Sequence, residues 1–211
     1  QTTGPVDSVT IEASGDVATT DTTGVLGGLQ ETMRPAVYLR RTDLTNPDTQ
    51  LHDIAHAVPE GDTLGRLHAL SGLVKDAVEY TQGMTSSTTT AAQALALGKG
   101  VCQDQAHVFI AAARLLDLPA RYVTGYLYDP DREDPADETH AWAEAHVAGL
   151  GWVGFDITNQ LCPTDSYVRL ATGLDAADAA PLRGMVIGTQ EEAMTIDIAV
   201  ARTQAQSQSQ S

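Results

Sequence analysis

One cysteine of this chain occupies a position that favours chemical reactivity. Cys102 follows a glycine-bearing turn, residues 98–101, and begins a long apolar run that predicts a helix over 102–116. The partial positive charge at a helix N-terminus stabilises a thiolate, and the free N–H groups of the first turn can hold an oxyanion. A small buried hydrophobic role is equally compatible with this position, because free cysteines are among the most buried residues. Position alone leaves both interpretations open.

A nucleophilic thiol needs a base, and the base needs an orienting partner. His140 begins a segment of alternating residues, 140–147, and Asp156 lies near the end of the next, 151–157. If residues 148–150 form a three-residue loop, Asp156 lies on the same face of the hairpin as His140, one diagonal step away. A two-residue loop would place it on the opposite face. We predict the three-residue loop, and with it a contact between the two side chains.

The other histidines are weaker candidates. His146 shares the strand face of the proposed base, but Asp156 lies further from it in this register. His107 lies on the far side of the nucleophile helix and is interpreted as a packing residue. His52 and His56 are four residues apart, as in helical zinc sites, but no third ligand is near. We interpret these two as a solvated helix face and expect neither a metal nor a cofactor.

The elements that must position these residues change character along the chain. Helices, with apolar residues at three- and four-residue steps, are predicted over 62–78, 88–97 and 102–116, the first two capped by Asp62 and Ser87. Strands, with alternating residues, are predicted over 121–128, 140–147, 151–157 and 195–202. Helices followed by consecutive strands are typical of an α+β fold with an antiparallel sheet.

Three parts of the chain differ in composition. Residues 1–50 are rich in Thr, Asp and Gly with short β-prone pieces such as 8–13, so we expect a β-rich N-terminal segment, with the remnant of an upstream β domain as one interpretation. The first residue is not Met, which agrees with a fragment or a processed product. Residues 51–203 are expected to form the catalytic domain, and 204–211 a disordered Gln/Ser tail.

Charge and cysteine content exclude some classes of protein. The chain of 211 residues has 12 Lys and Arg against 28 Asp and Glu, a net charge of −16. This excess argues against binding to nucleic acids and to anionic membranes, and no run of roughly 18 apolar residues predicts a transmembrane helix. The two cysteines make no disulfide scaffold, and Cys162, in a turn before Pro163, is interpreted as structural. We expect the reducing cytoplasm, with a cleaved export signal as the alternative.

Several segments together resemble the bacterial transglutaminase-like superfamily, in matching order between about residues 64 and 202. They are 100–107 (GVCQDQAH), 118–126 (LPARYVTGY), 140–144 (HAWAE), 151–159 (GWVGFDITN) and 181–184 (PLRG). The resemblance implies a papain-like, transglutaminase-like core in which N-terminal helices pack on an antiparallel β-sheet. It also implies a catalytic triad of Cys102, His140 and Asp156.

Members of this family are described as cysteine proteases or amide acyltransferases. The resemblance therefore implies acyl transfer through a thioester, with a peptide or small amide as substrate. It suggests Tyr80 as a second oxyanion donor, because related enzymes use an aromatic donor upstream of the cysteine; packing of Tyr80 on the core is the alternative. A catalytically silent peptide-binding module on the same fold, and a thiol acyltransferase with a small activated donor, are the alternative functions. The oligomeric state is not indicated.

Two positions depart from the family pattern. Gln105 replaces an aromatic residue and Ile157 replaces a proline, and neither is a triad position, so both bear on substrate preference rather than on the chemistry. Residues 129–138, which lead up to His140, contain six acids and one arginine. A solvated loop is the ordinary interpretation of such a run, and our hypothesis is that it favours cationic substrates.

Overall fold

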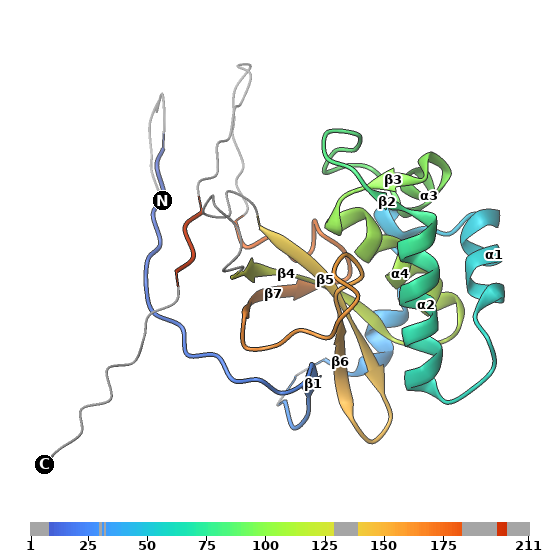
Figure 1. Cartoon of the computed structure of the whole chain (residues 1–211), viewed down its shortest axis with the longest axis horizontal. Coiled ribbons are helices and arrows are strands. Elements are labelled where there is room, and N and C mark those ends of the chain that lie inside the picture. The colour runs from blue at the N-terminus through green and yellow to red at the C-terminus, as the bar shows by residue number, and fades with distance from the viewer. Residues whose placement is uncertain (1–8, 30, 32, 129–138, 183–197, 202–211) are drawn as a thin grey trace, which may run out of the picture.

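Four helices cover one face of a curled antiparallel sheet (Figure 1). The computed structural model describes residues 9–29, 31, 33–128, 139–182 and 198–201. Its helical elements are η1 (Pro35–Leu39), η2 (Asp43–Thr45), α1 (Thr49–Ala57), α2 (Thr63–Ala77), α3 (Ala91–Leu97) and α4 (Cys102–Leu115). Its strands are β1 (Val25–Leu26), β2 (Glu79–Tyr80), β3 (Lys99–Gly100), β4 (Ala120–Leu127), β5 (His140–Val147), β6 (Gly151–Phe155) and β7 (Tyr167–Gly173). The predicted α+β class with an antiparallel sheet is confirmed.

Local capping sets where the helices begin. Asp62 accepts a hydrogen bond from the N–H of Gly65 (2.9 Å), so α2 begins where the sequence predicts. The second helix begins later than predicted, because Thr90 rather than Ser87 caps it, in a reciprocal pair with Gln93. Gly98 ends α3 in the left-handed conformation (φ 67°).

The central element is α4, whose residues 104–114 are all buried. It packs directly against β5, where Ala141, Ala143 and Ala145 belong to the same hydrophobic core. The Phe109 ring on α4 stacks on Phe155 of β6 (centroids 5.2 Å apart). The interface between helix and sheet is therefore largely apolar.

The sheet has the strand order β1-β6-β5-β4-β7, with every pair antiparallel. A second, two-stranded sheet pairs β2 with β3 in parallel, and it sets Tyr80 beside Gly100. The register of β4 against β7 shifts between Thr124 and Gly125. This bulge needs glycine, because a Cβ at Gly125 would lie 2.6 Å from the Trp142 ring.

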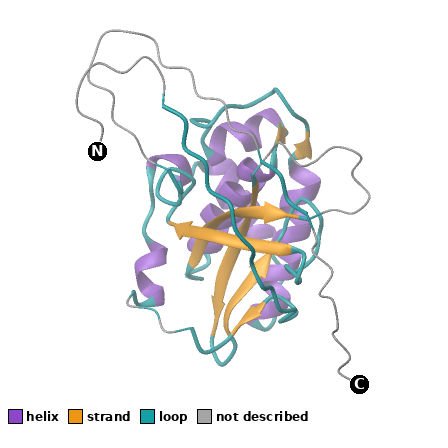
Figure 2. Ribbon diagram, turned by 90° about the vertical axis from the view of Figure 1, so that its left-hand side faces the viewer, coloured by secondary structure: helices purple, strands orange, loops and turns teal. Residues whose placement is uncertain are grey.

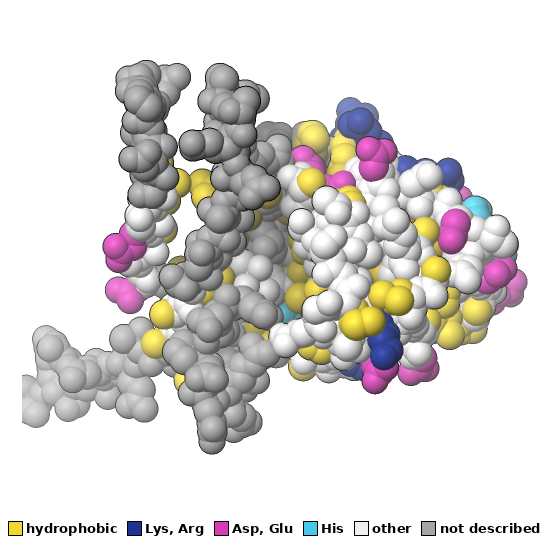
Figure 3. All heavy atoms as spheres, turned by 90° about the horizontal axis from the view of Figure 1, so that it is seen from above, with side chains coloured by type: hydrophobic (Ala, Val, Ile, Leu, Met, Phe, Trp, Pro, Cys, Tyr) yellow, Lys and Arg dark blue, Asp and Glu magenta, His cyan; other side chains and the backbone are white. Residues whose placement is uncertain are grey.

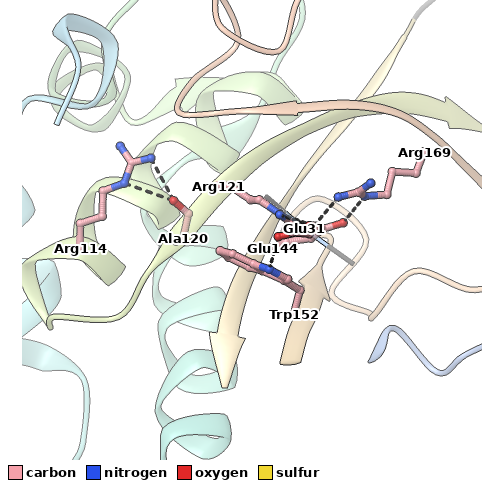
Figure 4. Close-up of polar contacts among 7 residues, drawn as sticks. All are labelled: Glu31, Arg114, Ala120, Arg121, Glu144, Trp152 and Arg169. Carbon is pink, nitrogen blue, oxygen red and sulfur yellow. Dashed lines mark hydrogen bonds and ion pairs between the residues drawn. The ribbon is translucent and has the colours of Figure 1, made fainter. Parts of the chain in front are cut away.

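The face of the sheet away from the helices carries a buried ionic network (Figure 4). Glu144, with no exposed surface, accepts hydrogen bonds from Arg121 (2.7 Å) and from Arg169 (2.7 and 3.1 Å). Arg121 also pairs with Glu31, and its guanidinium lies over the Trp152 ring, 3.8 Å from the centroid. These contacts fasten Glu31 to the sheet, because a buried charge is stable only with its partners.

The N-terminal part of the chain differs from the prediction. Residues 9–13, expected as a strand, are in no strand, and the described residues before α1 contain one short strand, β1, and two 3-10 helices. Residues 17–26 instead cross the outer face of the sheet (Figure 2), where they line a cavity of about 260 Å³ with Trp142 and Arg169. The expectation of a β-rich N-terminal segment is therefore wrong for the described residues, because most of residues 17–26 lie across the face of the sheet instead of pairing as strands.

Two further elements differ. Helix α1 was anticipated only as a solvated helix face carrying His52 and His56, whereas its apolar Leu51 and Ala55 pack into the core. Half of the strand expected over 195–202 lies outside the described residues, and residues 198–201, which are described, are not in a strand. Among the described residues the last strand is β7, which the sequence did not reveal. The predicted disordered tail, 204–211, and the acidic run, 129–138, also lie outside the described residues.

The surface on the helical side is mixed in charge. In the view of Figure 3, Lys and Arg side chains lie singly or in small groups among Asp and Glu. In the part of the chain that the structure describes, no helix is both long and apolar enough to cross a bilayer.

Candidate active site

Cys102 is the first residue of α4, at the helix end that carries partial positive charge. The buried Asp104 fixes this end, because its carboxylate accepts hydrogen bonds from the Val101 N–H (2.8 Å) and the Thr85 hydroxyl (2.6 Å). Glycine is needed at position 100, since a Cβ there would lie 2.7 Å from Asp104 Cβ. The segment 100–104 therefore builds a rigid helix start on which the half-buried thiol stands.

The β5–β6 hairpin brings His140 and Asp156 together. Val147 pairs with Gly151, as a three-residue loop requires. His140 Nε2 and Asp156 Oδ2 are 2.6 Å apart, so the predicted contact is confirmed. The His140 side chain is 13% exposed whereas that of Asp156 is 0% exposed, so only the imidazole of this pair is accessible to a bound substrate.

Asp156 is held by several donors at once. Its Oδ2 also accepts hydrogen bonds from the Tyr167 hydroxyl (2.6 Å) and from Asn159 Nδ2 (2.8 Å), while Oδ1 accepts from the Asn159 N–H (3.1 Å). Burial alone would raise the pKa of this carboxyl, but the hydrogen bonds and the attraction of His140 outweigh it and lower the pKa. Asp156 is therefore a fixed anion beside the imidazole.

His140 lies between this anion and the thiol. Burial opposes protonation, but hydrogen bonds with Asp156 and Cys102, together with their negative charges, raise the pKa of His140 to about 10. Because Nε2 is bonded to Asp156, Nδ1 is the ring nitrogen left for Cys102. The ring is confined by Trp142, stacked 6.1 Å away, and by Tyr167 at 5.9 Å. The arrangement can hold an imidazolium next to a thiolate.

Tyr80 approaches the same helix start from another direction. In the parallel β2–β3 pair it lies opposite Gly100, two residues before Cys102. Its side chain is half-buried. The backbone thus places Tyr80 near the nucleophile segment, and its role as an oxyanion donor stays a prediction.

The structure separates the other candidate residues from this cluster. His146 packs edge-on to Trp152 (5.4 Å), and His107 is fully buried, where its Nε2 accepts a hydrogen bond from the Ala176 N–H (3.1 Å). Burial lowers the pKa of His107 to about 4. His52 and His56 are exposed on α1, and among the described residues no group of three or more His, Cys, Asp or Glu side chains is arranged to hold a metal ion.

Cys162 contrasts with Cys102. Both are free thiols and partly buried, but burial raises the pKa of Cys162. The chain therefore contains a second cysteine, of ordinary or lower reactivity, against which Cys102 can be compared.

Sequence reasoning missed two residues that hold the aspartate. Asn159 follows Asp156 by three residues, and this Asx-type spacing is a local signal that could have identified it. Tyr167 begins the strand that was not predicted, so no local signal connected it to the site.

Comparisons with known proteins show the family of the chain. The family model described as the transglutaminase-like superfamily matches residues 52–157. In the curated proteins, uncharacterized protein Rv2569c of Mycobacterium tuberculosis is 36% identical over 152 residues, which are 68% of this chain and 48% of that protein. Uncharacterized protein ML0607 of Mycobacterium leprae is 34% identical over 130 residues, or 59% of this chain and 46% of that protein. The chain thus spans about half the length of the curated relatives that it matches.

A solved structure extends the comparison to three dimensions. The crystal structure of a "putative cysteine protease" from Cytophaga hutchinsonii is similar with a TM-score of 0.62 and 31% identity, covering 76% of this chain and 55% of that one. The match of the family model spans both Cys102 and the hairpin that carries His140 and Asp156. On this evidence the chain belongs to the transglutaminase-like superfamily.

Proposed function

We propose that this protein is a thiol enzyme that cleaves or transfers amide bonds through a thioester intermediate. The observation that carries the proposal is the position of His140, whose Nε2 lies 2.6 Å from the Asp156 carboxylate and whose pKa is raised by both Asp156 and the Cys102 thiol at the start of α4. In this assignment Cys102 is the nucleophile, His140 is the general base and acid, and Asp156 orients the imidazole. The similarity to the Cytophaga structure supports the same class of chemistry.

The steps follow from these roles. His140 takes the proton of Cys102, and the thiolate attacks the carbonyl carbon of an amide, forming a C–S bond and an oxyanion. The backbone N–H of Cys102, at a helix end without an intrahelical acceptor, stabilises that oxyanion, with Tyr80 as the proposed second donor. His140 then returns the proton to the nitrogen as the C–N bond breaks, and a thioester remains on Cys102.

The second half-reaction releases the acyl group. His140 takes a proton from a water molecule, whose oxygen attacks the thioester carbonyl. The C–S bond then breaks, so that Cys102 leaves as the thiolate and a carboxylic acid is released. An amine in place of water gives a new amide, which is transamidation. A peptide or small-molecule carboxamide is the proposed substrate.

Two properties of the environment complete the proposal. Both cysteines are free thiols, which suits a reducing compartment, and we place the protein in the cytoplasm. A preference for cationic substrates rests on the acidic residues 129–138, which lie outside the described part of the chain, so it stays a prediction from the sequence.

Alkylation and substrate turnover test the proposal. Iodoacetamide near pH 6 should label Cys102 much faster than Cys162, because only Cys102 is paired with an imidazole. Screening peptide and small-amide libraries should give turnover that Cys102→Ala abolishes. If Cys102 reacts no faster than Cys162, the proposal is wrong and a catalytically silent module is favoured.

A further inference from the structure

The side chain of Gln105 joins three segments of the candidate site. Its Nε2 donates a hydrogen bond to the Val78 carbonyl (2.7 Å), and its Oε1 accepts one from the Thr158 hydroxyl (2.7 Å). Gln105 is fully buried on α4, three residues after Cys102, and therefore lies on the same side of the helix. Its partners lie two residues before Tyr80 and two residues after Asp156.

The turn that begins with Asp156 is anchored at several points. Asp156 and Leu161 form an antiparallel bridge that closes it. Lys75 on α2 donates to the Thr158 carbonyl (2.7 Å), and Gln160 donates to the carbonyl and the hydroxyl of Ser71 (3.2 Å each). These bonds fix the turn relative to α2, whereas the bond from Thr158 to Gln105 fixes it relative to the helix that carries the thiol.

The position of the Asp156 turn relative to α4 is the constraint that matters for the contact between the thiol and the imidazole. His140 and Asp156 belong to one hairpin, so their mutual distance is set by strand register. Cys102 belongs to another element, and its distance from His140 depends on how α4 sits against the hairpin. A buried amide with both ends bonded is suited to this, because its two hydrogen bonds have defined lengths and directions.

We propose that Gln105 is a positioning residue that locks the Asp156 turn to α4 and thereby keeps Cys102 within hydrogen-bonding distance of His140. This inference rests on the proposed function. Gln105 does not touch the reacting atoms, and its effect passes through Thr158 and the turn. This role differs from the expectation that the glutamine at this position bears on substrate preference alone.

The test uses the pH dependence of Cys102 alkylation, which a purely structural role would not move. Gln105→Met keeps the side-chain length and removes both bonds, and Thr158→Val removes the hydroxyl with little change in shape. In both variants the rate of iodoacetamide labelling of Cys102 at pH 6 should fall about tenfold, because a thiol held less closely to the imidazole is less reactive. Thr158→Ser keeps the hydroxyl and should restore the wild-type profile.

Coupling and stability controls make the result specific. If the two residues act as one link, the double variant should be no slower than either single variant. Ile110→Val, in the buried part of the same helix, should lower the melting temperature without changing the pH profile. Labelling is followed by mass spectrometry of the Cys102 peptide, with the Cys162 peptide as the internal reference.

Each outcome has a distinct meaning. If wild-type Cys102 labels no faster than Cys162, the proposed function fails and the positioning role fails with it. If wild-type Cys102 is activated and Gln105→Met leaves its pH profile unchanged, the positioning role alone is wrong. A profile that shifts as much in Ile110→Val as in Gln105→Met would also overturn it, since loss of stability would then explain the effect.

Discussion

The contact between His140 and Asp156 makes a quantitative prediction about the thiol. Asp156→Asn preserves shape but removes the negative charge 2.6 Å from His140 Nε2. The side-chain amide of the new Asn can donate a hydrogen bond to His140 Nε2. This bond favours the state in which Nε2 carries no proton. We therefore expect the imidazolium to be lost near neutral pH, and with it the positive charge beside Cys102.

The size of the effect follows from the separation of the charges. Two unit charges about 4 Å apart attract by about 4 kcal/mol at an effective dielectric constant of about 20, which corresponds to about 3 pKa units. This agrees with a pKa of His140 raised to about 10 in spite of burial. Only part of this change reaches the thiol, so labelling of Cys102 by iodoacetamide at pH 6 should slow by about 10- to 1000-fold.

The assay compares second-order labelling rates between pH 5 and pH 10. At the alkaline end every accessible thiol is ionised, so the rates of wild type and Asp156→Asn should converge there. Asp53→Asn, on the exposed side of α1, is the matched control and should leave the profile unchanged. Circular dichroism and thermal melting confirm that each variant is folded.

One result would refute the reasoning. If folded Asp156→Asn labels Cys102 with the wild-type pH profile, the carboxylate does not determine the charge of His140. The short contact would then be a structural hydrogen bond only, and the proposed roles of both residues would have to be abandoned.

Three further predictions concern the surroundings of this pair. Because the pKa of His140 is raised from 6.5 to about 10, its contribution to stability is fully present below about pH 6.5 and is lost towards pH 10; the stability difference between wild type and His140→Ala in urea titrations should shrink over that range. Tyr167→Phe removes one of the hydrogen bonds that lower the pKa of Asp156 and keeps the ring, so the variant should be about 1 kcal/mol less stable at neutral pH and should lose less stability on acidification than wild type, as followed by chemical denaturation. Glu144→Gln weakens the pairing of Arg121, which is 1% exposed, and should cost about 3 kcal/mol in the same denaturation experiment while leaving the pH profile of Cys102 unchanged.

Much of the candidate site could be predicted because its signals are local. The start of α4 at Cys102 follows from the glycine-bearing turn before it, and Asp104 completes the helix end within the same few residues. That His140 and Asp156 lie on the same face of the hairpin follows from the loop length. Side chains alternate between the two faces along a strand, so adding or removing one loop residue would move Asp156 to the opposite face. Both inferences needed only neighbouring residues.

The residues that were missed depend on contacts between distant segments. Tyr167 reaches Asp156 because β7 joins the edge of the sheet beside β4, and the bulge at Gly125 sets that register. An edge strand has few sequence constraints of its own, so its partner could not be inferred. The path of residues 17–26 across the sheet has the same origin, because it is determined by the surface it covers rather than by its own pattern.

The approach of Cys102 to His140 also depends on side-chain size in the interface between α4 and β5. Ala141, Ala143 and Ala145 alternate along β5 and face the core that contains α4, so helix and strand approach closely. A larger residue at these positions would move α4 away from the hairpin without disturbing the contact between His140 and Asp156, because both of those belong to the hairpin side. The contact between His140 and Asp156 can therefore form even when Cys102 is too far from His140 to be activated. Activation requires the alanine interface to bring α4 close and, in our proposal, Gln105 to lock it there.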